Sequence, residues 1–122
     1  MSDDNPAKPL AGATLCAVDA IKLGGAIVLD FAHEQARYSI LVARNKDGAI
    51  AAYENLCPHA RSPLERPDGR VVVHEQKFLV CANHGASFRM EDGRCVAGPG
   101  LGTALNRVGI VVAGGFVVVA SA

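Results

Sequence analysis

The stretch of sequence that decides the fold runs from Tyr53 to Gly85 and reads YENLCPHARSPLERPDGRVVVHEQKFLVCANHG. It contains two boxes, Cys57-Pro58-His59 and Cys81-Ala82-Asn83-His84, and each box follows a run of residues typical of a β-strand. Each box supplies one thiolate and one imidazole, which are ligand types of zinc and iron–sulfur sites. The intervening residues, 60–80, are enough for a hairpin. We therefore expect two loops to meet and enclose a metal centre.

The rest of the chain consists of short β-type runs separated by turn signals. The runs are rich in Val, Ile, Leu and Ala, and Gly-Gly, Asp-Gly and Asn-Lys-Asp-Gly sequences mark the turns. We predict strands at Thr14–Val18, Ala26–Asp30, Tyr38–Arg44, Ala49–Glu54, Val71–Val73, Phe78–Val80, Ser87–Met90, Val108–Val112 and Phe116–Ala120. Strands this short, joined by hairpin turns, predict an all-β fold, either an antiparallel β-sandwich or a small barrel.

The organisation along the chain predicts one domain with a short tail. A chain of 122 residues has the common size of a single domain. Residues 1–12, rich in Asp, Pro and Ala, are expected to form a flexible tail, and residues 13–122 the domain. Residues 31–37 are predicted to form a loop between two strands.

Charge and hydrophobicity exclude several classes of partner. Twelve basic and twelve acidic residues give no net charge, so neither nucleic acid nor an anionic membrane is an expected partner. The most apolar stretch, Val108 to Ala120, is interrupted by glycines and is shorter than the ~20 residues that span a bilayer. Asp3 and Asp4 stand where a secretory signal carries basic residues, so we expect a cytoplasmic protein. Cysteines in that reducing compartment favour metal binding or catalysis over disulfides.

The residues of the two boxes leave two kinds of metal site open. One is a structural zinc site with two Cys and two His ligands. Zinc fingers, however, usually place two cysteines in one box and two histidines in the other, whereas each box here mixes the two ligand types. Mixed boxes suit a centre with two different metal positions, one bound by both thiolates and the other by both imidazoles.

The double box resembles that of the Rieske-type [2Fe–2S] proteins, which carry Cys-x-His and Cys-x-x-His boxes on two β-hairpin loops. The resemblance extends to Pro63-Leu64 and Gly85 after the boxes, to Asp92-Gly93-Arg94-Cys95, and to the loop Gly98-Pro99. It is most specific over about residues 50–100, and strand texture extends it over roughly 14–120. It implies a Rieske-like fold, a cluster-binding part at about residues 55–100, and one [2Fe–2S] cluster per chain.

The resemblance also implies a ligand set. Cys57 and Cys81 would bind the inner iron, and His59 and His84 the outer, solvent-facing iron. Three residues would lie close to the cluster without binding iron, namely Pro58, Gly85 and Pro99. Pro58 fixes φ between two ligands, and Gly85 permits a close backbone approach or a positive φ. No catalytic residue is predicted, because neither iron has an open coordination position for a substrate.

The neighbours of the boxes predict a low reduction potential. High-potential members of the family have an extra disulfide-forming cysteine in each box, and Ser62 and Asn83 occupy the corresponding positions here. Those members also carry a Ser and a Tyr that donate hydrogen bonds to the cluster sulfurs, where this chain has Ala86 and Phe88. We therefore expect a potential near the bottom of the Rieske range, which runs from about −150 to +300 mV.

The other two cysteines and two histidines are not expected to bind the metal. Cys16 and Cys95 are predicted to pack in the core, and His33 and His74 to lie on the surface. Two arginines, Arg61 and Arg66, flank the first box and are interpreted either as partner-facing or as solvated side chains.

A Rieske centre alone carries single electrons and catalyses no reaction. The chain is most similar to stand-alone Rieske ferredoxins, which pass electrons from an NAD(P)H-dependent flavin reductase to a terminal oxygenase that hydroxylates aromatic or related compounds. The resemblance implies that both partners dock transiently at the tip that carries His59 and His84. Two alternatives stay open: the small subunit of an NAD(P)H-dependent nitrite reductase, and a zinc-stabilised interaction module without a redox role.

Overall fold

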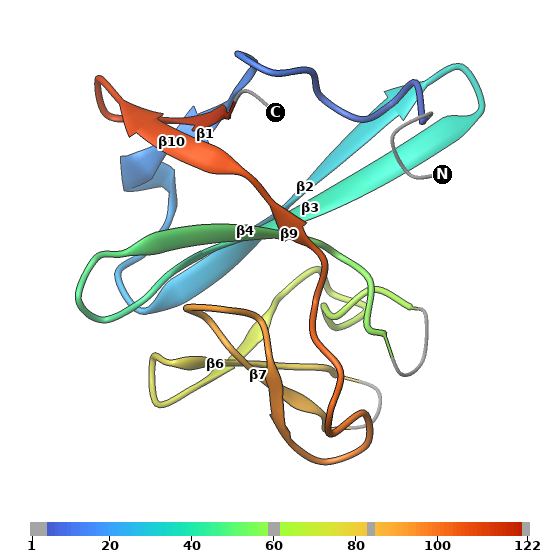
Figure 1. Ribbon diagram of the computed structural model, residues 1–122, viewed down its shortest axis with the longest axis vertical. Helices are drawn as coiled ribbons and strands as arrows, with labels where there is room; N and C mark the ends of the chain where they lie inside the picture. Colours follow the sequence, from blue (N-terminus) through green and yellow to red (C-terminus); the bar gives the residue numbers. More distant parts are fainter. Residues whose placement is uncertain (1–4, 59–61, 83–84, 121–122) are drawn as a thin grey trace.

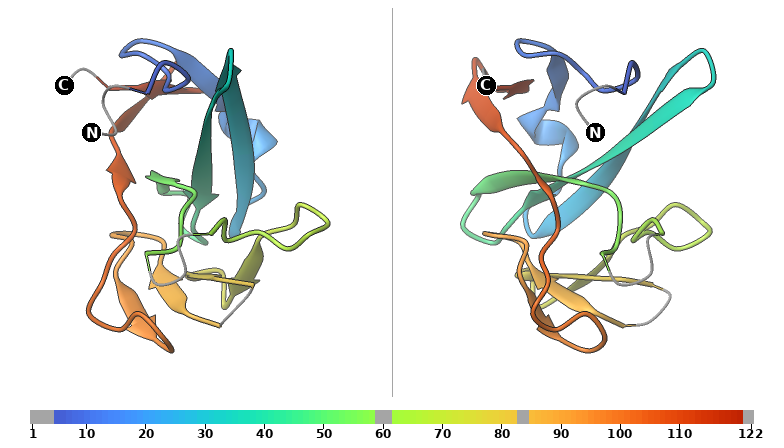
Figure 2. Two further views of the ribbon diagram at one scale, coloured as in Figure 1. Left: turned by 90° about the vertical axis from the view of Figure 1, so that its right-hand side faces the viewer. Right: turned by 45° about the vertical axis from the view of Figure 1, so that its right-hand side comes forward.

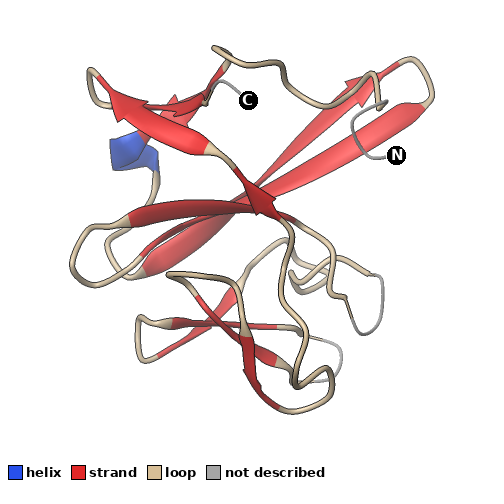
Figure 3. Ribbon diagram, viewed as in Figure 1, coloured by secondary structure: helices blue, strands red, loops and turns tan. Residues whose placement is uncertain are grey.

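The computed structural model describes residues 5–58, 62–82 and 85–120, which form antiparallel β-structure (Figure 1, Figure 3). The strands are β1 (Thr14–Ala17), β2 (Gly25–His33), β3 (Ala36–Arg44), β4 (Ile50–Glu54), β5 (Val72–His74), β6 (Phe78–Val80), β7 (Ser87–Arg89), β8 (Cys95–Ala97), β9 (Arg107–Val108), β10 (Ile110–Ala113) and β11 (Phe116–Val119), and a short 3-10 helix, η2 (Val18–Ala20), follows β1. Within the described residues the strands form three sheets, ordered β1-β11-β10, β2-β3-β4-β9 and β5-β6-β7-β8. The prediction of an antiparallel all-β fold is confirmed.

The middle sheet is built on the long hairpin of β2 and β3, which pair along their whole length. Strand β3 contains the uninterrupted apolar run Ile40-Leu41-Val42-Ala43, and all four side chains are buried. Because successive side chains of a strand point to opposite faces, Leu41 and Ala43 enter one hydrophobic core, while Ile40 and Val42 enter another. The middle sheet is therefore covered on both faces at this strand.

The two outer sheets lie on opposite sides of the middle one (Figure 1, Figure 2). In Figure 1 the sheet of β1, β10 and β11 is at the top, and the small sheet of β5–β8 is at the bottom. The upper core contains Ile21 and Val117, whereas the lower core contains Phe88 and both box cysteines, Cys57 and Cys81. The small sheet and the loops around it therefore make up the part of the fold that carries the boxes.

The structure differs from the sequence-based prediction in three elements. The predicted loop at residues 31–37 is wrong, because β2 and β3 continue through it to a tight turn at Glu34-Gln35. Its side chains are mostly exposed, so the apolar alternation that marks a strand is missing there. The prediction also missed β8, and it fused β9 and β10, which separate at Gly109 and join different sheets.

Residues 5–12, which we expected to belong to a flexible tail, contact the body of the protein. Ala7 is buried in the upper core. The Asn5 amide donates a hydrogen bond of 3.0 Å to the Arg37 carbonyl, and the Gly12 N–H donates one of 2.9 Å to the Val119 carbonyl. These contacts fix the described part of the segment against β3 and β11. No helix among the described residues is long and apolar enough to cross a membrane.

Candidate metal centre

The two box cysteines lie at the beginning of two loops, one after β4 and one after β6. Both Cys57 and Cys81 are almost fully buried and belong to the same core. None of the chain's four cysteines, all of which are described, forms a disulfide. The other two predicted ligands, His59 and His84, lie outside the described residues, as do Arg61 and Asn83. The structure therefore describes the thiol half of the predicted ligand set.

Each cysteine loop is closed by a main-chain hydrogen bond of the same pattern. The Cys57 N–H donates to the Ser62 carbonyl at 2.7 Å, and the Cys81 N–H donates to the Ala86 carbonyl at 2.8 Å. In each case the acceptor lies five positions after the cysteine. The second loop has a further bond of 2.9 Å from the Gly85 N–H to the Cys81 carbonyl, and Gly85 has a φ of +75°. A positive φ favours glycine, as the sequence predicted for this position.

The two loops contact each other directly through the main chain. Leu64 follows the first box and is fully buried in the lower core. Its carbonyl accepts a hydrogen bond of 3.0 Å from the N–H of Ala82, the residue after Cys81. This hydrogen bond links the two cysteine loops to each other.

Asn55 holds the first loop against the middle sheet, and sequence reasoning missed it. Its side-chain oxygen accepts a hydrogen bond of 2.9 Å from the Leu64 N–H. Its side-chain nitrogen donates to Ser39 Oγ at 3.1 Å and to Glu65 Oε1 at 2.6 Å. An asparagine at the end of a strand usually marks a turn, so nothing local in the sequence predicts that this one is buried.

A third loop, which follows β8, lies against the second cysteine loop. Gly98 has a φ of +80°, and a Cβ there would lie 3.0 Å from the Gly85 carbonyl oxygen and 3.2 Å from the Ala86 Cα. The third loop therefore approaches the second box loop closely at Gly98, the residue before Pro99. Cys95 is buried in β8, as predicted, and its thiol donates to the Ala97 carbonyl at 3.4 Å.

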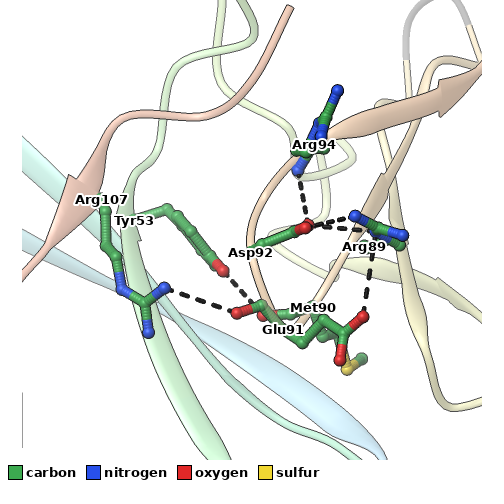
Figure 4. A network of polar contacts seen from close by, with 7 residues as sticks. All are labelled: Tyr53, Arg89, Met90, Glu91, Asp92, Arg94 and Arg107. Carbon is green, nitrogen blue, oxygen red and sulfur yellow. Dashed lines mark hydrogen bonds and ion pairs between the residues drawn. The ribbon is translucent and has the colours of Figure 1, made fainter.

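A polar network fastens the small sheet to the middle sheet (Figure 4). The Tyr53 hydroxyl, on β4, donates a hydrogen bond of 2.7 Å to the Met90 carbonyl in the turn after β7. Burial raises the pKa of Tyr53 to about 12. In the same turn, Asp92 pairs with Arg89 and accepts a bond of 3.0 Å from the Arg94 N–H (Figure 4). The hydrogen bond from the Arg89 side chain is the main cause that lowers the pKa of Asp92.

Two histidines, one arginine and one cysteine remain among the residues that the sequence singled out. His33 and His74 are exposed at the tips of two hairpins, as predicted. Arg66 is exposed and forms an ion pair of 3.8 Å with Asp68. Cys16 is on β1 in the other outer sheet, where it is half-buried, and its burial raises the pKa of its thiol.

The donor set of the described residues fits a metal that binds thiolates. Cys57 and Cys81 offer two buried thiols on two loops that are linked to each other, and thiolates are the soft ligands of iron–sulfur and zinc centres. No group of three or more potential metal ligands occurs among the described residues, which exclude both histidine positions. Fold and site together define a β-protein whose two buried thiols lie on two linked loops, one after β4 and the other between the paired strands β6 and β7.

A comparison with family models identifies this arrangement. The model of the Rieske [2Fe-2S] domain matches residues 13–113. The chain belongs to this family, as its sequence boxes predicted, and a protein of this family carries a [2Fe–2S] cluster. No curated protein matches the chain.

Solved structures show the same fold in ferredoxins and oxygenases. The ferredoxin of carbazole 1,9a-dioxygenase from Nocardioides aromaticivorans IC177 has a TM-score of 0.66 and 27% identity, with 93% of this chain and 97% of that chain covered. The terminal oxygenase of the same system has a TM-score of 0.72 and 20% identity, covering 90% of this chain but 30% of that chain. A chain in the complex of reduced oxygenase and oxidized ferredoxin in carbazole 1,9a-dioxygenase has a TM-score of 0.67 and 21% identity, with 88% and 100% covered. The chain is thus a Rieske protein similar to ferredoxins of oxygenase systems.

Proposed function

We propose that this protein is a one-electron carrier that receives electrons from an NAD(P)H-dependent flavin reductase and passes them to a terminal Rieske oxygenase. The observation that carries the proposal is the extent of the match. The chain covers 97% of a ferredoxin of similar fold, at 27% identity. A domain of this kind is sufficient for electron transfer, and it is not itself an enzyme.

We assign the ligands to Cys57, His59, Cys81 and His84. Buried thiols on two linked loops support the cysteines, whereas the histidines rest on the box pattern of the sequence. When bound, the cluster supplies a reversible one-electron couple. The chain's own contribution is to exclude water from both thiols and to fix their loops relative to each other. The proposed domain comprises residues 13–122, with the cluster-binding part at about 55–100.

The same surface serves both redox partners in this proposal. Both would dock at the tip that carries the two histidines, because electron transfer requires a short path to the cluster. Strand β8 and the third loop after it each expose one apolar side chain, Val96 and Leu101, which are 41% and 68% exposed. The solved complex of an oxygenase with a ferredoxin of this fold supports docking to an oxygenase. We propose that the protein acts in the cytoplasm.

The proposed centre has a low potential. Ala86 and Phe88 are fully buried in the lower core, and neither side chain has a hydrogen-bond donor. Fewer donors to the cluster sulfurs leave the reduced, more negative state less stabilised. This property suits a carrier that is reduced by a flavin.

Metal analysis together with electron paramagnetic resonance tests the proposal. The protein should contain iron and acid-labile sulfide in a one-to-one ratio, and reduction with dithionite should produce the signal of a Rieske cluster. The reduced protein should then support single-turnover product formation by a Rieske oxygenase. A colourless protein with stoichiometric zinc would contradict the proposal, and so would a reduced cluster that no Rieske oxygenase oxidises.

A further inference from the structure

Asn55 has an unusual environment for an amide side chain. It is 5% exposed and, among the residues that the structure describes, it is the one buried residue with an amide or charged side chain. It lies between β4 and the first cysteine loop, two positions before Cys57. A buried amide is costly unless its oxygen and nitrogen both find partners, and both atoms of Asn55 have them.

The contacts of Asn55 join three segments of the chain. Its N–H donates to the Ser39 carbonyl at 2.9 Å, and its side-chain nitrogen donates to the Ser39 hydroxyl, so that it is fixed on β3. The same nitrogen donates to the Glu65 carboxylate, and its oxygen accepts from the Leu64 N–H. Asn55 therefore binds the end of the first cysteine loop, at Leu64 and Glu65, and connects it to the middle sheet.

The connection continues into the second cysteine loop. Leu64, whose N–H is held by Asn55, offers its carbonyl to the N–H of Ala82. A continuous chain of hydrogen bonds thus runs from β3 through Asn55 and the Leu64 peptide group to Ala82, the residue beside Cys81. An amide suits this position, because it accepts and donates at once, whereas a carboxylate only accepts and an alanine does neither.

We propose that Asn55 is a positioning residue that fixes the first cysteine loop relative to the second, and thereby sets the geometry of the two thiolates at the cluster. The inference rests on the proposed function in one respect, namely that Cys57 and Cys81 are ligands. Groups that orient metal ligands without touching the metal typically change metal affinity or activity by about 10–100-fold when they are lost. Asn55 therefore governs how firmly the cluster is held and at what potential it is reduced.

The test compares Asn55→Ala with Asn45→Ala. Asn45 is a matched control, because its side-chain oxygen, like that of Asn55, accepts main-chain hydrogen bonds (from Asp47 and Ala49), but it lies in the β3–β4 turn. Both variants should melt at lower temperature. Only Asn55→Ala should lose its cluster to an iron chelator faster, on the order of tenfold, and show an altered resonance spectrum and midpoint potential.

A pair of substitutions separates positioning from simple packing. Asn55→Asp keeps the acceptor for the Leu64 N–H but sets a second carboxylate against Glu65, so cluster loss should again be fast. Combining it with Glu65→Gln restores a donor to the contact, because the Gln amide then donates to the Asp carboxylate. The double variant should return towards the wild-type rate and spectrum. If Asn55→Ala fails to fold, the comparison of the double variant with Asn55→Asp still tests the role of Asn55.

The outcomes distinguish this inference from the proposed function. A wild-type protein without a [2Fe–2S] cluster overturns both. A wild-type cluster that persists in Asn55→Ala with unchanged chelation rate, spectrum and potential overturns the role of Asn55 alone. Failure of the double variant to recover relative to Asn55→Asp likewise overturns it.

Discussion

The Tyr53 hydroxyl donates a hydrogen bond of 2.7 Å to the Met90 carbonyl and so connects the middle sheet to the small sheet that carries the box loops. Both residues are buried. Gly93, in the same turn, packs on the Tyr53 ring so closely that a Cβ there would lie 2.7 Å from Cε1. Tyr53 therefore helps to fix the orientation of the cluster-binding part relative to the rest of the protein, together with Asn55 and the shared lower core.

Tyr53→Phe should reduce the free energy of unfolding by about 1–2 kcal/mol, because it leaves the buried Met90 carbonyl without this donor. Urea-induced unfolding followed by circular dichroism measures the change. Tyr38→Phe is the matched control: its hydroxyl donates to the Glu54 carboxylate at 2.9 Å in a partly exposed position, so the loss should be smaller. An equal or larger loss in the control would contradict the role given to Tyr53.

The raised pKa of Tyr53 predicts a loss of stability at alkaline pH. An unfolded tyrosine titrates near its ordinary pKa of 10, whereas burial raises the pKa of Tyr53 in the folded protein to about 12. Between these values the unfolded chain releases a proton that the folded protein retains, so the free energy of unfolding falls as pH rises. Tyr53→Phe lacks this titration. The difference in stability between wild type and the variant should therefore narrow from pH 10 to pH 12 in urea titrations.

The third loop offers a comparison between two glycines. Gly98 and Gly102 both have a positive φ, so alanine strains the backbone by roughly 1–2 kcal/mol at either position. A Cβ at Gly102 meets no atom within 4 Å, but a Cβ at Gly98 would press on Gly85 and Ala86. Gly98→Ala should therefore lower the melting temperature more than Gly102→Ala, and only Gly98→Ala should alter the resonance spectrum of the cluster. Identical spectra in the two variants would show that the third loop does not control the second box loop.

Much of the fold follows from local sequence, because most strands here carry their own signals. The run around Ile40 is apolar and β-branched, and the turn at residues 45–48 contains Asn, Asp and Gly, so both were predicted. The tip of the β2–β3 hairpin was not, since its exposed residues show no alternation and only pairing with the neighbouring strand makes them extended. Strand β8 is short and two of its residues, Val96 and Ala97, are exposed.

The candidate site was predictable to the extent that ligands follow a spacing rule. Cys57 and Cys81 stand out in the sequence because their boxes are specific, and the fold buries both. The supporting residues follow no such rule. Asn55 is bound by Ser39, Leu64 and Glu65, and a partner sixteen positions away on another strand leaves no trace in the local sequence. Tertiary hydrogen bonds of this kind become visible only in the structure.

The assignment of ligands predicts different fates for the four cysteines. Cys57→Ser and Cys81→Ser should each abolish cluster binding, because a serine hydroxyl is a poor substitute for a soft thiolate. Cys95→Ser, also buried, should retain the cluster, since a hydroxyl can still donate to the Ala97 carbonyl. Cys16→Ser should retain it too. Iron and sulfide content of the purified variants measures each outcome, and cluster loss in Cys95→Ser alone would reverse the assignment.

The buried apolar residues after the second box predict a low potential that one substitution should raise. Protein-film voltammetry of the wild type should give a midpoint in the lower part of the Rieske range, and a value above about +100 mV within that range of about −150 to +300 mV would contradict the prediction. Ala86→Ser places a hydroxyl donor in the second box loop and should shift the midpoint upward, because a hydrogen bond to a cluster sulfur stabilises the reduced state. Ala97→Ser is the control, because Ala97 is exposed on β8 and the hydroxyl of the introduced serine has access to water. Equal shifts in both variants would mean that the added polarity, and not a bond from the second loop, sets the potential.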